Sequence, residues 1–445
     1  MNESDTGGLA ARGVALDLLQ DVLRRSQALD LRLEGAKSFA GLPARDRAFA
    51  HNLVATALRR LGQIDAVIAA FLERPLARGA QVPQDILRLG VAQLLFTEVP
   101  GHAAVDTAVR LVRERGSARF DDLVNALLRR AQREAAGLVA GQDAARLNTP
   151  DWLWQSWQAA YGDDACRAIA AAHLSPAPLD LTVKADPAAW ADRLGGSVVA
   201  AGTVRLADPG PVRELQGYDD GAWWVQDAAA ALPARLLGRV QDLRVLDLCA
   251  APGGKTAQLA AGGAQVTAVD RAARRLDILK ANLARLGLTA EMVLADVLDW
   301  SPAGTFDAIL LDAPCSATGT IRRHPDLAHT KTAADVAKLA VLQGRLLARA
   351  ADWLRPGGTL VFATCSLQPE EGPAQAAAFL AARPDFRRQP LAPGEIAGIG
   401  PEMISPEGDL RTLPCHLAAA GGMDGFFAAR LRRREDGTVA PPSTG

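Results

Sequence analysis

The second half of the sequence alternates between short apolar runs and longer stretches of helical periodicity. Helical patterns, such as residues 274–286 and 333–354, separate runs that have the length of buried strands. This alternation favours a mostly parallel sheet covered by helices on both faces, and ligands bind such sheets at the carboxyl ends of the strands. The sequence therefore predicts an α/β domain with strands at residues 245–248, 266–269, 291–294, 308–311 and 359–363.

Residues 11–138 show a different pattern, with apolar residues three or four positions apart and no strand alternation. This pattern predicts an all-α domain. A polar stretch at 141–150 precedes a tryptophan-rich helix, and two strands are expected at 179–184 and 197–206, around a helix at 187–194. A chain of 445 residues exceeds the usual size of one core. We expect an all-α domain at 1–140, a linker helix with a small α+β segment at 141–225, the α/β domain at 226–434 and a disordered tail at 435–445.

Composition and cysteine usage exclude several classes of protein. No apolar run approaches the ~20 residues of a membrane span, and the polar, acidic start does not resemble a secretory signal, so we expect a cytoplasmic protein without a membrane. The five cysteines and six histidines lack disulfide or metal-ligand spacing, so we expect free thiols and no metal. The net charge is −1, so a nucleic acid would have to be held by local basic patches.

A candidate cofactor site follows the first strand of the α/β domain. Residues 245–256 read as a buried strand, a glycine turn and the start of a helix, but they match neither the dinucleotide fingerprint nor the phosphate loop. Asp270, Asp296 and Asp312 follow the next three strands. For each acid alone, helix capping or solvation explains its position about as well as a cofactor contact does. The glycine turn favours a cofactor with a carboxylate and few phosphates. The three acids together strengthen this prediction, because an acid after the second strand can accept from both ribose hydroxyls.

Two cysteines follow the last two predicted strands. Cys315 comes after the fourth strand and Cys365 after the fifth, so both should lie at the ligand-binding edge. A single free cysteine is more often a small buried apolar residue. As a pair beside a cofactor, they point to nucleophilic thiol chemistry, such as addition to C6 of cytosine, which activates C5 toward a methyl donor. The residues alone leave open which cysteine attacks. A redox pair is a weaker alternative.

Several motifs resemble the RNA cytosine-C5 methyltransferases, and among them the bacterial small-subunit rRNA methyltransferases of the Sun, Fmu or RsmB family. The first third also resembles the NusB-like RNA-binding domain that this family carries. The resemblance implies a Rossmann-like class I S-adenosylmethionine-dependent methyltransferase domain, an RNA-binding role for the segment 141–225, and 5-methylcytosine as product. The matching motifs are residues 225–227, 247–256, 312–319, 321–326, 363–366 with Pro369, Glu370 and Glu371, and 424–427.

The family resemblance also assigns roles to individual residues. Cys365 would be the nucleophile that adds to C6, and Cys315 would assist product release. Asp312, with Lys255, would hydrogen-bond the cytosine edge and stabilise the adduct. The expected contacts of S-adenosylmethionine are Cys249, Ala250, Ala251, Pro252, Gly253, Gly254, Lys255, Asp270, Arg275, Asp296 and Asp312.

The expected substrate is RNA with the target base looped or flipped out, because a duplex hides C5 and C6. Arg322, Arg323 and His324, which follow Cys315 closely, form a candidate phosphate clamp, with a solvated charge run as the alternative. We expect 16S rRNA or a small-subunit assembly intermediate as the partner and a monomeric enzyme. The alternatives are the same chemistry on tRNA, or an RNA-binding protein resembling antitermination factors, with a vestigial methyltransferase domain.

Overall fold

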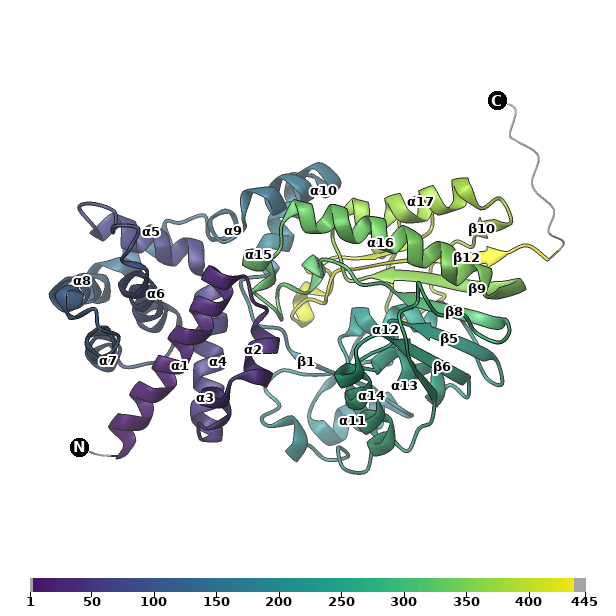
Figure 1. The fold of residues 1–445 in the computed structure, drawn as a ribbon, viewed down its shortest axis with the longest axis horizontal. Helices are drawn as coiled ribbons and strands as arrows, with labels where there is room; N and C mark the ends of the chain where they lie inside the picture. The colour runs from purple at the N-terminus through teal and green to yellow at the C-terminus, as the bar shows by residue number, and fades with distance from the viewer. Residues whose placement is uncertain (1–2, 436–445) are drawn as a thin grey trace. The chain divides into compact units, whose positions relative to one another are not determined.

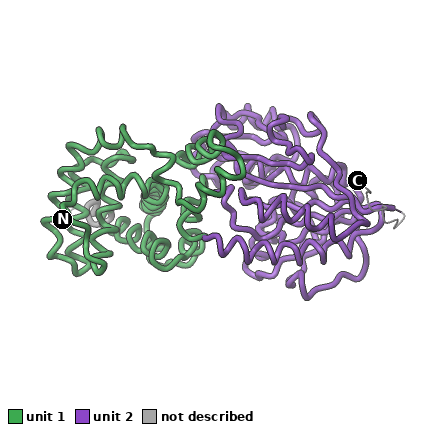
Figure 2. The backbone as a smooth tube through the Cα atoms, turned by 90° about the horizontal axis from the view of Figure 1, so that it is seen from above, with its two compact units in different colours: residues 1–176, 321–331 green, residues 177–320, 332–445 purple. Residues whose placement is uncertain are grey.

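The computed structural model describes residues 3–435 and divides into two compact units (Figure 2). The helical unit comprises Met1–Pro176 and Ile321–Lys331, and the sheet unit comprises Ala177–Thr320 and Thr332–Gly445. The predicted middle segment, residues 141–225, is therefore shared between the two units. Of the predicted tail, 435–445, all but Glu435 lies outside the described residues.

The helical unit contains the helices that the apolar spacing predicts (Figure 1). In its first helix Ala11, Ala15, Leu18 and Val22 recur every three or four positions, and all four are buried in one core with the following helices. The helices are α1 (Glu3–Arg25), α2 (Leu29–Gly35), α3 (Lys37–Ala40), α4 (Ala44–Arg59), α5 (Leu61–Phe71), α6 (Gln81–Phe96), α7 (Gly101–Glu114), α8 (Asp121–Ala140), α9 (Ala144–Leu147), α10 (Asp151–Ala172) and α15 (Leu327–Thr330).

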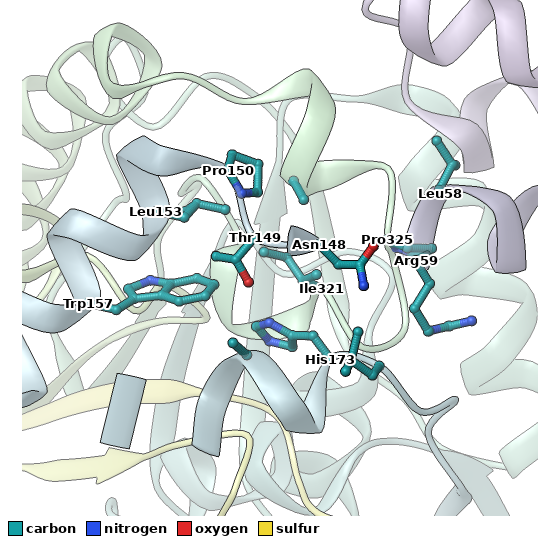
Figure 3. Close-up of a pocket in the computed structure, with 13 residues that line it drawn as sticks. Leu58, Arg59, Asn148, Thr149, Pro150, Leu153, Trp157, His173, Ile321 and Pro325 are labelled. Carbon is teal, nitrogen blue, oxygen red and sulfur yellow. The ribbon is translucent and has the colours of Figure 1, made fainter. Parts of the chain in front are cut away.

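In the sequence, the segment Ile321–Lys331 lies between two parts of the sheet unit, but it packs within the helical unit. The backbone N–H of Leu29 donates to Asp326 Oδ2 at 3.0 Å, and Arg59 Nη2 donates to the carbonyl of Arg322 at 3.0 Å. Figure 3 shows Ile321 and Pro325 facing side chains of the helical unit around a cavity of about 20 Å³, which is room for one water. This segment is thus an integral part of the helical unit.

The sheet unit begins with a small antiparallel sheet of strand order β2-β3-β1-β4. Its strands are β1 (Leu179–Val183), β2 (Ser197–Val198), β3 (Val204–Leu206) and β4 (Trp223–Val225), with α11 (Pro187–Leu194) beside them. The predicted strand at 197–206 is interrupted by a 3₁₀ turn at Ala200–Gly202. A buried ion pair between Arg205 Nε and Asp180 Oδ1, at 2.7 Å, joins β3 to β1.

The main sheet has the strand order β10-β12-β9-β8-β5-β6-β7, with β11 paired to β12. All five predicted strands are present and parallel, and three antiparallel strands that the sequence analysis did not predict extend the sheet beyond β9. The strands are β5 (Arg244–Leu248), β6 (Gln265–Asp270), β7 (Glu291–Leu294), β8 (Phe306–Asp312), β9 (Leu354–Thr364), β10 (Phe386–Arg388), β11 (Leu410–Thr412) and β12 (Phe426–Arg433).

Helices cover both faces of this sheet, as predicted (Figure 1). Val245, Leu310 and Val361 pack against α12 and α13, whereas Leu246 and Leu360 pack against α16 and α17. Neighbouring residues of one strand point to opposite faces, so nearly continuous apolar strands are needed. The helices of this unit are α12 (Ala228–Arg235), α13 (Gly254–Ala261), α14 (Ala273–Leu286), α16 (Ala333–Asp352) and α17 (Pro373–Ala382).

Candidate active site

The turn between β5 and α13 is built from small residues in unusual backbone conformations. Cys249 has φ +59° and Gly253 has φ +101°. A Cβ atom on Gly253 would lie 2.7 Å from Leu279 Cγ, so the position admits only glycine without a shift. The backbone N–H of Ala251 donates to Asp270 Oδ2 at 3.2 Å, and Arg275 hydrogen-bonds the carbonyl of Ala251. The turn is therefore fixed to the end of the neighbouring strand.

Three carboxylates surround this turn at the carboxyl edge of the parallel strands. Asp270 ends β6 and is buried, Asp296 lies two residues after β7, and Asp312 ends β8. Because β8, β5, β6 and β7 are neighbours in that order, these side chains flank the turn after β5 on both sides. Acceptor oxygens for ribose hydroxyls beside a turn that permits close backbone approach fit a nucleoside cofactor with little negative charge. The residues predicted to bind the cofactor are thus brought together.

Lys255, in the first turn of α13, forms an ion pair with Asp312, at 2.6 Å between Nζ and Oδ2. Burial alone would lower the pKa of the Lys255 ammonium, but the charge of Asp312 and its hydrogen bond outweigh burial and raise this pKa. The ammonium also lies 5.0 Å from the ring centroid of Phe426. Lys255 is therefore a fixed positive charge at the predicted catalytic edge.

The two predicted catalytic cysteines lie side by side. Cys315 Sγ and Cys365 Sγ are 3.4 Å apart, in loops that follow the paired strands β8 and β9. The hydrogen bond to Cys365, followed by burial, raises the pKa of the Cys315 thiol well above its usual value. Cys315 therefore keeps its proton at neutral pH, and either sulfur can be the donor of this pair. A third thiol at the edge, Cys249, is also protonated, because burial raises its pKa to about 12.

Several buried polar residues of the site were not predicted as functional residues in their own right. Asp247, inside β5, is fully buried, and burial raises its pKa to about 7. Its Oδ2 accepts from Thr256 Oγ1 at 2.6 Å, which ties the strand to α13. Glu371 is likewise fully buried next to the cysteine loops. The sequence contained a signal for Asp247, because an acidic residue is unusual within an apolar strand. For Glu371 the only signal was its position in a family motif.

The predicted phosphate clamp is not assembled at this edge. Arg322 is only 1% exposed and lies in the helical unit, so its guanidinium is not at the surface in this structure, and its predicted contact with RNA stays a prediction. His324 Nδ1 lies 3.1 Å from Asp30 Oδ2, whereas Arg323 is exposed. The physical reason is the packing of Ile321–Lys331 against the helices, which buries Arg322 but leaves Arg323 exposed and His324 half-buried.

Within residues 3–435, no helix combines the length and apolar character that crossing a membrane requires. The same range contains no group of three or more His, Cys, Asp or Glu side chains placed to hold a metal ion.

Comparisons with known proteins identify relatives of both parts of the chain. The family model described as 16S rRNA methyltransferase RsmB/F matches residues 234–432, and that of the NusB family matches residues 9–133. Ribosomal RNA small subunit methyltransferase B of Pseudomonas putida is 38% identical, with 92% of this chain and 97% of that protein covered. The protein of the same name from Xanthomonas campestris is 37% identical, with 96% and 98% covered.

Solved structures show the same fold. The crystal structure of PH0851 has a TM-score of 0.74 at 22% identity, covering 96% of this chain and 98% of its own. A methyltransferase homolog protein from Pyrococcus horikoshii has a TM-score of 0.52 at 29% identity, covering 64% of this chain and 93% of its own.

These findings confirm the predicted NusB-like helical domain, the Rossmann-like methyltransferase domain and the class of enzyme, a methyltransferase that uses S-adenosylmethionine. The relatives are covered over nearly their whole length at more than 30% identity. The chain therefore belongs to the 16S rRNA methyltransferase RsmB/F family.

Proposed function

We propose that this protein methylates C5 of a cytosine in 16S rRNA through a covalent adduct between Cys365 and C6 of the base. The observation that carries the proposal is the pair of thiols 3.4 Å apart beside the Lys255–Asp312 ion pair. The printed names of the relatives, ribosomal RNA small subunit methyltransferase B, support rRNA as the substrate. A vestigial enzyme is disfavoured, because the thiols, Lys255 and the strand-end carboxylates are all present in one site.

The order of bond changes follows from the chemistry of cytosine. C5 is a poor nucleophile until the Cys365 sulfur bonds to C6, which converts the ring into an enamine. Asp312, which Lys255 holds through a hydrogen bond, would bond the N3/N4 edge and stabilise the adduct. When bound, S-adenosylmethionine supplies the methyl group that C5 takes up. Loss of the C5 proton to a base then expels the Cys365 thiolate and restores the aromatic ring.

Cys315 assists the departure of that thiolate. When Cys365 carries negative charge, the protonated Cys315 can donate its S–H to Cys365 Sγ and stabilise that charge. The charge develops when Cys365 leaves C6, so the loss of Cys315 should slow release more than attack. The thiol contact by itself does not distinguish the two sulfurs, so the assignment of Cys365 as the nucleophile rests on the family resemblance.

The cofactor would be held by the turn at residues 249–255, together with Asp270, Arg275, Asp296 and Asp312. Asp270 would accept from the ribose hydroxyls; in support, each of its oxygens accepts one backbone N–H and retains a further lone pair. We further propose that the enzyme is a cytoplasmic monomer and that Arg323 and the helical unit contact the RNA, either as free 16S rRNA or in an assembly intermediate.

The test combines two cysteine variants with methylation mapping. Cys365→Ser should abolish turnover and form no adduct, whereas Cys315→Ser should accumulate a denaturation-resistant protein–RNA complex. Bisulfite sequencing of rRNA and tRNA from a deletion strain and its parent identifies the substrate. Full turnover in Cys365→Ser would refute the assigned nucleophile, and a lost methyl group in tRNA alone would refute the rRNA assignment.

A further inference from the structure

Glu371 places one buried carboxylate between the two cysteine loops. It ends the 3₁₀ turn Pro369–Glu371 and is fully buried. Its Oε1 accepts from the backbone N–H of Ser316 at 2.9 Å and from Gln343 Nε2 at 3.1 Å. Its Oε2 accepts from Ser366 Oγ at 2.6 Å and from Ser316 Oγ. All four donors are neutral, so these contacts are hydrogen bonds and not ion pairs.

The partners of Glu371 are the residues that directly follow the two cysteines. Ser316 follows Cys315, and Ser366 follows Cys365, and the two serine hydroxyls are 3.1 Å apart. Gln343, from α16, donates to the carbonyl of Pro314 at 2.9 Å as well as to Glu371. One carboxylate therefore connects the loop after β8, the loop after β9 and the helix that covers them.

Strand pairing alone does not fix the cysteines. The register between β8 and β9 ends at Asp312 and Ala363, so both thiols lie in loops beyond the last paired residues. Attack on C6 requires the sulfur to be held in a narrow range of positions, and a misplacement of about 1 Å can cost about 100-fold in rate. The Gly319 N–H donates to the Cys365 carbonyl at 2.9 Å, and the four buried hydrogen bonds to Glu371 add a side-chain support that reaches the residue after each cysteine.

We propose that Glu371 is a positioning residue that holds the Cys315 loop against the Cys365 loop and so sets the spacing of the two thiols. The inference rests on the proposed function only in assigning the chemistry to these two cysteines. Glu371 touches neither thiol in this arrangement and acts through Ser316 and Ser366. Its negative charge also helps to raise the pKa of the Cys315 thiol, after the hydrogen bond to Cys365 and burial.

The test compares Glu371→Ala and Glu371→Gln with Glu370→Ala. Glu370 is the adjacent residue of the same motif and carries the same charge, but it is exposed, so it is the matched control. Glutamine has the shape of glutamate and can still bridge Ser316, Ser366 and Gln343, because serine hydroxyls also accept hydrogen bonds. Alanine removes the bridge entirely. A positioning role predicts that glutamine rescues most of what alanine loses.

The first measurement needs neither RNA nor S-adenosylmethionine. Phenylarsine oxide binds two neighbouring thiols through one arsenic atom, and its affinity is measured by titration with intact-protein mass spectrometry. The wild type and Glu370→Ala should bind one equivalent, which Cys315→Ser and Cys365→Ser should lose. Glu371→Ala should bind at least about tenfold more weakly, and Glu371→Gln should stay near the wild type. Equal affinity in all three glutamate variants would overturn the proposal.

The second measurement is methyl transfer. Glu371→Ala should lower kcat by about 100-fold with the KM for S-adenosylmethionine unchanged, and Glu371→Gln should retain activity within about tenfold of the wild type. A folded Glu371→Gln that loses as much as Glu371→Ala would show that charge, not positioning, matters. If Glu371→Ala does not fold, Ser366→Ala removes one of the four hydrogen bonds to Glu371, together with the contacts of Ser366 Oγ to Ser316, Thr318 and the Gln368 N–H. Unchanged arsenical affinity in that variant would also refute the role. A wild type that binds the arsenical but methylates no RNA would refute the proposed function alone.

Discussion

Asp247 provides a quantitative test of the electrostatics beneath the active site. The side chain is fully buried within β5, and burial raises the pKa of its carboxyl from the ordinary 3.8 to about 7. The folded protein therefore binds this proton more tightly than the unfolded chain does. Each pKa unit corresponds to 1.36 kcal/mol, so the carboxylate form costs the folded state about 4 kcal/mol at pH 8.

The sign and the pH window follow from this difference. Below pH 4 the carboxyl is protonated in both states, and burial carries no charge penalty. As the pH rises from about 4 to about 7, the unfolded chain releases the proton and the folded state retains it, so stability falls and then levels off. Asp247→Asn removes the titration, because the amide cannot ionise but still offers Thr256 Oγ1 an acceptor.

The expected result is a pH-dependent gain in stability. Oδ1 of Asp247 has no hydrogen-bond partner, and in the variant the amide nitrogen takes the place of this oxygen. Any loss of stability from burying the amide N–H without a partner is the same at every pH. Relative to wild type, the variant should gain up to about 4 kcal/mol between pH 4 and pH 8, or roughly 8–16 °C in Tm. The assay is thermal unfolding across this range, followed by circular dichroism.

The control is Asp299→Asn, which changes the net charge equally but at an exposed position. A stability difference between Asp247→Asn and wild type that stays constant from pH 4 to pH 8 would refute the reasoning. A matching pH dependence in Asp299→Asn would assign the effect to net charge and not to burial.

Two further predictions concern the cofactor turn and the segment Ile321–Lys331. Gly253→Ala should lower the free energy of unfolding by about 1–3 kcal/mol, because φ at this position is +101° and the new Cβ would meet Leu279. The variant should also bind S-adenosylmethionine more weakly in calorimetry. Unchanged binding would contradict the role of the turn. Arg322→Ala should destabilise the helical unit by about 1–3 kcal/mol in thermal unfolding. Because the Arg322 guanidinium is buried, the salt dependence of RNA binding should not change. A shallower salt dependence in the variant would show that Arg322 contacts a phosphate.

The sequence predicted the parallel part of the sheet because local signals determine it. Each strand from β5 to β9 is a short apolar run, bounded by turns, with a helical pattern beside it. β12 is also largely buried, yet its paired strand β9 lies far earlier in the chain, and its sequence ends in arginines. Pairing of this kind depends on long-range register, which the periodicity of one segment does not reveal.

The active site shows the same division between what a motif reveals and what the fold adds. Cys315, Cys365, Lys255 and Asp312 were predictable, since residues that follow adjacent parallel strands must meet at one edge. The sequence did not reveal which of the other polar side chains are buried, and their burial decides their roles. Glu371 is buried and bridges the two cysteine loops, whereas Glu370 is exposed. In the same way, Arg322 is buried and Arg323 is exposed. Neighbours of identical charge thus take different roles, because the hydrogen-bond partners and not the residue type decide which charge can be buried.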